Sequence, residues 1–247
     1  MAVNSVVPDH ARWHDLECGR YTEDLGAWLE LAARVPGRVL DLGCGTGRTT
    51  LALAHAGHEV TAVDVDEVLL RVLAERAADL PVRCVRADVR DLGSLAGERW
   101  PLIVMPMQTI QLLDSPDSRR QMFGEVRRHL EDDGLFAAAI VTRFETFDAR
   151  MGLPSPDIES YDGTLYLSRP TAVRVEGEAI AVERERWLVR PGSTPEGVGE
   201  DTVHLQSVSA AQLAAEAQSS ALEPLELIPV AETGEHVANE IVVMHAR

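Results

Sequence analysis

The sequence has few cysteines and no long apolar run. No hydrophobic stretch reaches the roughly 18–20 residues of a membrane-spanning helix, so we expect no membrane association. The three cysteines, Cys18, Cys44 and Cys84, lack metal-ligand spacing, and their odd number argues against a disulfide framework. Residues 1–5 contain neither a basic stretch nor an apolar signal region. We therefore expect a cytoplasmic protein that holds no metal.

Basic residues are also in short supply. The 247 residues include 40 Asp and Glu against 23 Lys and Arg, a formal net charge of −17. Binding to nucleic acid needs a basic footprint, and here the basic residues are dispersed, so we expect no nucleic-acid partner. A small-molecule substrate is favoured instead, and the acidic balance weakly favours a cationic or amine one. The oligomeric state stays open, with a homodimer as one option.

The most informative stretch is residues 38–47, Arg-Val-Leu-Asp-Leu-Gly-Cys-Gly-Thr-Gly. Its apolar first half has the length and composition of a buried strand, and residues 48–56 resemble a helix start. Between them lie three glycines at alternate positions, Gly43, Gly45 and Gly47. A turn without Cβ atoms can approach a ligand closely, and the free N–H groups of the first helical turn favour negative charge. The segment predicts a ligand site, the alternative being a glycine-rich turn without a ligand.

Acids follow the next two predicted strands. Asp64 ends the second strand, 21 residues after Gly43, and a ribose-binding acid is expected about 20 residues beyond such a turn. A carboxylate there can accept charge-assisted hydrogen bonds from two vicinal hydroxyls. Asp64 could instead cap the following helix, but Asp66 is better placed to do so. Asp88 follows the third strand within Ala-Asp-Val, and its alternative interpretation is a loop aspartate of an acidic protein.

The Gly-x-Gly-x-Gly spacing, with Asp41 two residues ahead of it, resembles motif I of the class I S-adenosylmethionine (SAM)-dependent methyltransferases. It differs from the Gly-x-Gly-x-x-Gly fingerprint of dinucleotide-binding proteins. The resemblance is specific over residues 36–113 and loose over 142–208, and it implies SAM as the cofactor. In this family the acid at Asp88 meets the adenine amino group, and the apolar residue at Val89 flanks the ring. The cofactor-binding residues that the resemblance implies are Tyr21, Asp41, Gly43, Cys44, Gly45, Thr46, Gly47, Asp64, Val65, Asp88, Val89 and Met105.

Two further segments fit the same resemblance. Small-molecule methyltransferases place a lid at the N-terminus, and a lid tyrosine can reach the SAM carboxylate; Tyr21 is the candidate, although it could equally pack on its own helix. After the fourth predicted strand, Gln108 and Gln111 resemble the polar positions of small-molecule N-methyltransferases. The chain lacks the Asn-Pro-Pro-Tyr loop of enzymes that methylate nucleobase amines, and Pro101 stands where an acid often starts this strand.

No side chain stands out as a general base. His204, His14 and Gln108 are weak candidates for a catalytic role, and Glu159 and Tyr161 are weaker still. A hydroxyl acceptor needs a stronger base than an amine, so this absence favours transfer to nitrogen. The prediction is therefore a SAM-dependent methyltransferase acting on a small metabolite at nitrogen. The alternatives are a small-molecule O-methyltransferase, a non-methylating SAM-binding protein and, less favoured, an NAD(P)-dependent oxidoreductase.

Alternating strands and helices predict an α/β fold. We expect a Rossmann-like, mostly parallel seven-stranded sheet with helices on both faces, plus a small antiparallel β insertion after the fifth strand. The expected parts of this single domain are an N-terminal lid (1–34), a SAM-binding core (35–141), a substrate-covering insertion (142–208), and a final helix and strands (209–247). Strands are expected at 38–42, 59–64, 82–86, 102–105, 134–141, 165–167, 172–175, 179–188, 202–208, 222–230 and 239–245, and helices at 48–56, 66–77 and 117–130, with another beginning at 209.

Overall fold

The computed structural model describes residues 9–233 and 236–246. Its chain divides into two compact units. The larger unit is built from the described residues of 21–143 and 206–247, and the smaller unit from those of 1–20 and 144–205. The chain therefore leaves the larger unit after its fifth strand and returns to it before its last helix.

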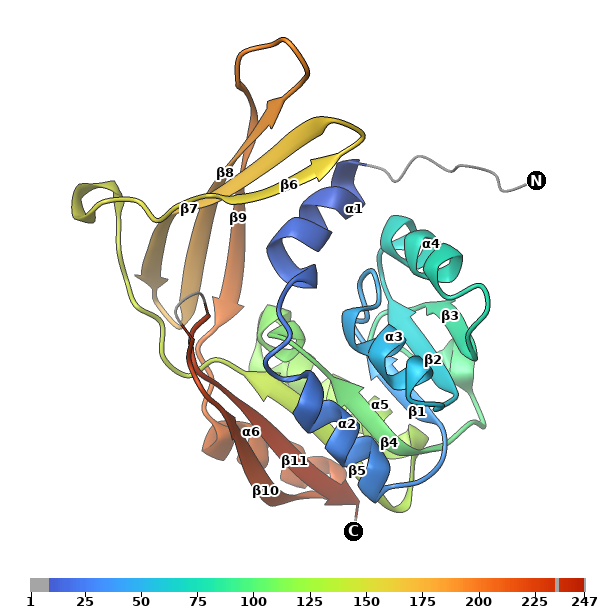
Figure 1. The fold of residues 1–247 in the computed structure, drawn as a ribbon. Coiled ribbons are helices and arrows are strands. Elements are labelled where there is room, and N and C mark those ends of the chain that lie inside the picture. The colour runs from blue at the N-terminus through green and yellow to red at the C-terminus, as the bar shows by residue number, and fades with distance from the viewer. Residues whose placement is uncertain (1–8, 234–235, 247) are drawn as a thin grey trace. The chain divides into compact units, whose positions relative to one another are not determined.

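A seven-stranded sheet forms the centre of the larger unit (Figure 1). The strand order is β10-β11-β5-β4-β1-β2-β3, and β11 runs antiparallel to both of its neighbours while the other pairs are parallel. This confirms the predicted mostly parallel seven-stranded sheet. The strands are β1 (Val39–Leu42), β2 (Val60–Asp64), β3 (Val82–Arg86), β4 (Trp100–Met105), β5 (Leu130–Ile140), β10 (Leu222–Val230) and β11 (Asn239–Ala246).

Helices cover both faces of this sheet, as predicted. One face packs against α2, α3 and α4, and the other against α5 and α6. One apolar layer is therefore buried on each side of the sheet. Three of the helices begin where a polar side chain accepts from free backbone N–H groups: Asp66 caps α4, Ser115 caps α5, and Ser209 caps α6. The helices of this unit are α2 (Leu25–Arg34), α3 (Arg48–His55), α4 (Glu67–Arg76), α5 (Pro116–His129) and α6 (Ala210–Ala217), with short 3-10 turns η2 (Gly93–Leu95), η3 (Thr109–Leu112) and η5 (Gln218–Ser220).

The smaller unit combines the N-terminal helix with a four-stranded sheet in the order β6-β7-β8-β9. The strand β7 pairs antiparallel with β6 and with β8, as expected for the insertion. Arg12 donates to the Tyr166 hydroxyl over 2.9 Å, and Arg186 binds the Glu17 carboxylate through Nε over 2.8 Å. The elements are α1 (Asp9–His14), the π-helix η1 (Asp15–Gly19), η4 (Ala149–Met151), β6 (Asp157–Tyr161), β7 (Thr164–Glu176), β8 (Ala179–Val189) and β9 (Glu196–Gln206).

Some element boundaries differ from the sequence prediction. The fifth strand begins at Leu130 rather than at residue 134, so Asp133, which has φ +62°, lies inside the strand. Strand β6 was not predicted, and β9 begins at Glu196 rather than at residue 202. The first part of β9 is exposed and rich in glycine and acids, so it forms through pairing with its neighbour and not through a hydrophobic pattern.

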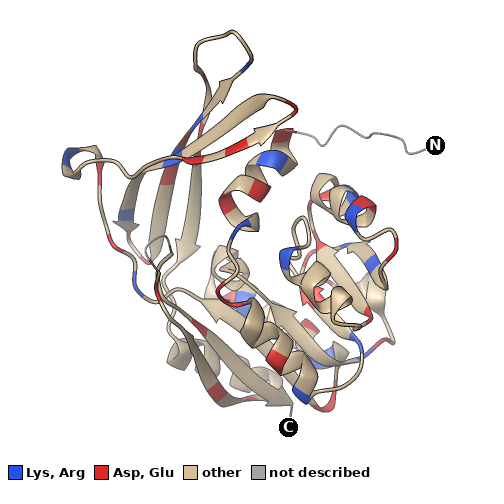
Figure 2. Cartoon of the chain, viewed as in Figure 1, with Lys and Arg blue, Asp and Glu red and all other residues tan. Residues whose placement is uncertain are grey.

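Acidic and basic side chains are interspersed along both units (Figure 2). In the part of the chain that the structure describes, no helix is long and apolar enough to cross a membrane. All three cysteines are free thiols: Cys44 is buried, while Cys18 and Cys84 are partly exposed.

Candidate functional site

The glycine turn after β1 is held tightly against two neighbouring segments. The N–H groups of Gly43 and Cys44 both donate to the carbonyl of Val63, at 2.8 and 3.0 Å, which joins the turn to the end of β2. Gly43 has φ +74°, and a Cβ atom placed there would lie 2.3 Å from Cγ2 of Thr109. Only glycine fits this position, because any side chain would meet η3 and would strain the backbone. The turn is therefore packed closely against η3 and the end of β2, at the carboxyl end of β1.

The carboxylate of Asp64 meets this turn. Its Oδ2 accepts a hydrogen bond from the N–H of Gly45 over 2.8 Å, and its Oδ1 accepts from the N–H of Asp66 over 2.9 Å. Each oxygen keeps further acceptor capacity, since a carboxylate offers about four lone-pair sites. The next residue, Val65, leaves 57% of its surface exposed. The structure thus places an acceptor and an apolar surface side by side at the edge of the glycine turn.

Asp41 lies beneath the turn with a carboxylate oxygen that has no partner. Its side chain is 1% exposed, and Thr50 donates to Oδ2 over 2.5 Å. No described residue donates to Oδ1, which is buried. Burial raises the pKa of Asp41 to about 6, although the Thr50 hydrogen bond and the charge of Arg48 oppose the rise. A buried, unsatisfied acceptor of this kind favours a hydrogen-bond donor or a cation nearby.

Replacing Asp41 with asparagine should change how stability depends on pH. The folded-state pKa of about 6 exceeds the ordinary value of 3.8, so the folded protein binds this proton more tightly than the unfolded chain. The contribution of Asp41 to the free energy of unfolding has its full value below about pH 4. It falls by up to about 3 kcal/mol as the pH rises past about 6. Asp41→Asn should remove that decline and raise the unfolding free energy at about pH 8 by about 1–3 kcal/mol. Urea unfolding at several pH values measures this, and an unchanged slope between about pH 4 and 6 would contradict it.

Tyr21 lies at the first turn of α3, next to the glycine turn. Arg48 donates to the Tyr21 carbonyl over 2.8 Å, and its guanidinium lies 5.2 Å from the centre of the Tyr21 ring. The same guanidinium binds the buried carboxylate of Asp24 at 2.5 and 2.9 Å. Asn239, at the start of β11, donates to the Tyr21 hydroxyl, and burial raises the pKa of this tyrosine. The structure therefore brings Tyr21 to the glycine turn, and Arg48, which the sequence analysis missed, lies beside it.

Asp88 and Val89 follow β3, as the sequence predicts. Asp88 is bound by its own neighbour Arg90: the backbone N–H and Nε of Arg90 donate to Oδ1 at 2.8 and 2.9 Å, and Nη2 donates to Oδ2 at 2.6 Å. These hydrogen bonds lower the pKa of Asp88. Oδ2 keeps acceptor capacity, since only one of these bonds reaches it. An arginine two residues after a loop aspartate was a visible signal for this pair that the sequence analysis did not use.

Three other predicted residues present little of their side chains. Cys44, Thr46 and Met105 are buried, and Met105 packs within the apolar core between the sheet and α5. Burial raises the pKa of the Cys44 thiol well above its ordinary value, which keeps it neutral. Any contact of these residues with a ligand would involve mainly their backbone atoms.

The segment after β4 carries both predicted glutamines. Gln108 is half-buried at the start of η3, whereas Gln111 is 0% exposed and its amide is used in three hydrogen bonds to backbone atoms. Gln111 therefore offers no free group to a substrate, and its interpretation as a polar position typical of N-methyltransferases loses its support. Thr109 lies between them and contacts Gly43.

The candidate bases belong to the smaller unit. The imidazole Nε2 of His204, on β9, lies 3.3 Å from Oε2 of Glu176, and both side chains are half exposed. His14 ends α1, while Glu159 and Tyr161 lie on β6. Tyr161 packs edge-on against Tyr166, with ring centres 5.3 Å apart. The glycine turn belongs to the larger unit, so neither unit by itself brings these candidates together with the turn.

Among the described residues, no group of three or more His, Cys, Asp or Glu side chains could hold a metal ion.

Comparison with known proteins finds similarity to methyltransferases in part of the chain. Residues 39–134 match the model of a methyltransferase domain. The cypemycin N-terminal methyltransferase of Streptomyces sp. is 35% identical over 111 residues, covering 44% of this chain and 44% of that protein. The magnesium-protoporphyrin O-methyltransferase of Rhodobacter capsulatus is 49% identical over 107 residues, covering 43% of this chain and 47% of that protein. The matched segments thus span less than half the length of these curated relatives.

The whole fold also has a counterpart among solved structures. A SAM-bound amino pentose methyltransferase from Micromonospora echinaspora superimposes with a TM-score of 0.75 at 14% identity, and the match covers 100% of both chains. At this identity the match concerns the fold. Together with the matched domain, it confirms the predicted resemblance to the class I SAM-dependent methyltransferases.

Proposed function

We propose that this chain, which carries a class I methyltransferase domain, transfers a methyl group from SAM to the nitrogen of a small metabolite. The observation that carries the proposal is the contact between the Asp64 carboxylate and the N–H of Gly45. This contact supports the proposal because the carboxylate, an acceptor of the kind that ribose hydroxyls need, lies at the carboxyl ends of parallel strands, where ligands bind in open α/β sheets.

The residues around the turn fit this cofactor. Gly43 lets η3 pack directly against the turn where a side chain would clash, and Val65 offers an exposed apolar surface for a ring. The unpartnered Oδ1 of Asp41 supplies a buried acceptor beneath the turn, which suits an ammonium group. In our proposal Asp64 holds the ribose, Asp88 accepts from the adenine amino group, and Tyr21 binds near the amino acid end.

The chemistry asks little of acid–base side chains. When bound, SAM supplies a methyl group that its sulfonium charge has already activated. The protein's part is to exclude water and to hold the acceptor atom in line at near-attack separation. An amine must arrive without its proton, and a desolvating pocket favours that neutral form. No described side chain of the larger unit stands at the turn as an obvious strong base, which supports nitrogen over oxygen as the acceptor atom.

The remaining parts of the proposal concern the roles of segments and the setting. In it, residues 1–34 act as a lid, 35–141 as the SAM-binding core, 142–208 as a substrate-covering insertion, and 209–247 as the closing helix and strands. Free cysteines support a reducing cytoplasm, and interspersed charges support a small metabolite rather than nucleic acid as the partner. A homodimer is compatible with all of these roles.

Calorimetry with SAM and with its demethylated product, S-adenosylhomocysteine, tests the cofactor. Binding of both in the micromolar range is the expected result, and no heat from either at concentrations up to about 1 mM would overturn the proposal. A parallel titration that follows NADH fluorescence tests the oxidoreductase alternative, and no NADH binding is expected.

A panel of amines, phenols and carboxylic acids incubated with methyl-labelled SAM tests the reaction. We expect label to appear in amines. Label in phenols alone would establish an O-methyltransferase, and cofactor binding without transfer to any class would favour a protein that binds SAM for another purpose.

A further inference from the structure

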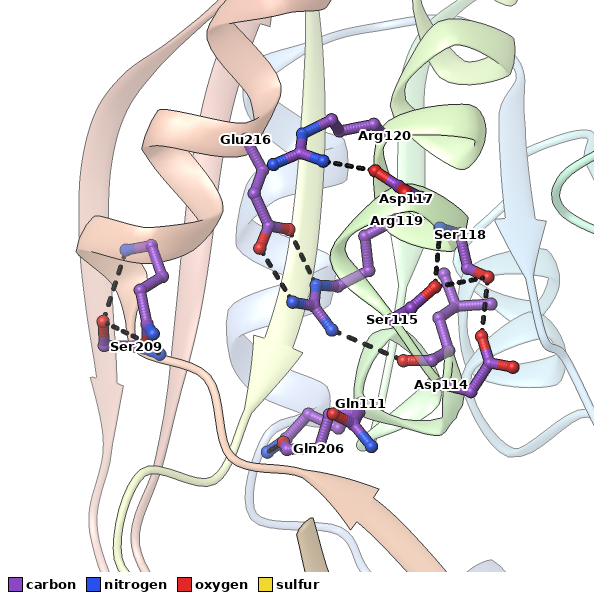
Figure 3. A network of polar contacts seen from close by, with 12 residues as sticks. Gln111, Asp114, Ser115, Asp117, Ser118, Arg119, Arg120, Gln206, Ser209 and Glu216 are labelled. Carbon is purple, nitrogen blue, oxygen red and sulfur yellow. Dashed lines mark hydrogen bonds and ion pairs between the residues drawn. The ribbon is translucent and has the colours of Figure 1, made fainter. Parts of the chain in front are cut away.

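The side chain of Gln111 joins three segments that lie far apart in the sequence. Its Nε2 donates to the carbonyl oxygens of Val141, over 3.1 Å, and of Gln206, over 2.9 Å. Its Oε1 accepts from the N–H of Val141 over 2.8 Å. Figure 3 shows Gln111, which lies within η3, close to Gln206, the last residue of β9. Every strong hydrogen-bonding group of this buried amide is therefore satisfied by backbone.

With Val141 the amide imitates a neighbouring strand. It accepts from the N–H and donates to the C=O of one residue, as a paired strand does in a ladder. Val141 follows directly after β5, so this pairing continues the hydrogen bonding of the sheet by one residue at its carboxyl edge. The segment that carries Gln111 is thus fastened to the sheet at the edge where the glycine turn lies.

The same segment forms one side of the glycine turn. The methyl group of Thr109 fills the space that a Cβ atom of Gly43 would occupy. Two residues earlier, Met107 adopts φ +56°, a left-handed conformation that is costly for this residue type and persists only where the surroundings hold it. The loop between β4 and η3 therefore needs an anchor, and Gln111 is placed to provide it.

A second anchor holds the far end of η3. Arg119 of α5 binds both carboxylate oxygens of Glu216 of α6 at 2.7 Å, and its Nη1 donates to the carbonyl of Leu113 over 3.4 Å (Figure 3). The Arg119 and Glu216 side chains are almost wholly buried. This pair fixes the residue that follows η3 to the helix layer, while Gln111, inside η3, fixes the turn to the sheet.

We propose that Gln111 is a positioning residue for the cofactor site: its amide sets the position of residues 106–112, and through Thr109 it sets the shape of the glycine turn. This inference rests on the proposed function, because it concerns the same site. A positioning role of this kind acts within a few tenths of an ångström, the tolerance that such sites need.

The variant Gln111→Glu tests the proposal with almost no change of volume. When ionised, the new side chain cannot donate, and it faces two carbonyl oxygens. When protonated, it regains one O–H donor beside an acceptor oxygen and so approximates the amide. Because burial raises the pKa of a carboxylic acid, the protonated form should prevail at about pH 6 and the ionised form at about pH 9.

Calorimetry with S-adenosylhomocysteine at these two pH values is the readout, with wild type measured at each. We expect Gln111→Glu to weaken binding at least about tenfold at about pH 9 and less than about threefold at about pH 6. The control Gln218→Glu makes the same change on an exposed side chain and should match wild type at both values. A purely structural role for Gln111 would lower the melting temperature without a pH-reversible change in affinity.

Hydrogen exchange of residues 106–113 without ligand separates this proposal from the proposed function. Faster exchange of this segment in Gln111→Glu at about pH 9 is expected whether or not the protein binds SAM. If wild type does not bind S-adenosylhomocysteine, the proposed function fails while exchange still tests the anchor. Equal affinity of wild type and variant, or unchanged exchange, would overturn the positioning role.

Discussion

Gly43→Ala should weaken the binding of S-adenosylhomocysteine at least about thirtyfold, a large effect for the addition of a single methyl group. Two costs add at this position. The backbone angle, φ +74°, strains any residue with a Cβ atom, and that Cβ would lie 2.3 Å from Cγ2 and 2.8 Å from Oγ1 of Thr109. Strain and overpacking together cost about 2–5 kcal/mol, which the turn can relieve only by moving.

Gly57→Ala is the matched control. Gly57 has φ +96°, and a Cβ atom there meets nothing within 4 Å, so this variant bears the backbone cost without the clash. We expect its affinity to stay within about twofold of wild type. The double variant Gly43→Ala with Thr109→Ala removes the two closest contacts and should recover part of the loss. Equal effects of the two single variants would show that the contact between the turn and η3 does not matter for binding.

Asp64→Ala should weaken the binding of SAM by about 1.5–3 kcal/mol, or about 10–150-fold. The expected loss has two parts, because the carboxylate both faces the proposed ribose site and holds the turn through the N–H of Gly45. Removing the carboxylate also leaves the N–H of Asp66, at the start of α4, without its hydrogen-bond acceptor. Calorimetry at fixed salt concentration gives the change in dissociation constant directly.

Asp91→Ala serves as the control for Asp64→Ala. Asp91 is an exposed loop acid whose Oδ1 accepts from the N–H of Gly93 over 3.1 Å, so its removal changes net charge by the same amount away from the turn. Its affinity for SAM should match wild type. An unchanged dissociation constant in Asp64→Ala would show that the ribose assignment is wrong.

Local sequence was sufficient to predict the sheet that carries the site. Strands at Val39–Leu42 and Val82–Arg86, and the last pair near the C-terminus, follow from apolar runs with turn residues between them, and the structure places them within a residue or so of expectation. Val39–Leu42 is wholly buried and the last strand largely so, while the other two strands are partly buried. In Val82–Arg86 the apolar residues mark the half-buried positions. The exposed first part of β9 has no such signal, and its position depends on its neighbour.

The predicted site residues divide in the same way. Asp64 and the glycine turn are adjacent through the topology of one strand–helix–strand unit, which sequence spacing reveals. Gln111 was misinterpreted because its partners, Val141 and Gln206, lie 30 and 95 residues away. Tyr21 could be placed near the turn by resemblance, but its bond from Asn239 spans 218 residues, and no local pattern marks it. Long-range hydrogen bonds to backbone atoms leave no periodic trace in a sequence.

A crystal structure of the protein with S-adenosylhomocysteine is the most direct test of the central claim. The ribose hydroxyls should lie within hydrogen-bonding distance of the Asp64 carboxylate, with the amino acid end against residues 43–47 and the adenine between Val65 and Val89. A ligand bound elsewhere, with the Asp64 carboxylate still bonded only to the N–H groups of Gly45 and Asp66, would contradict it.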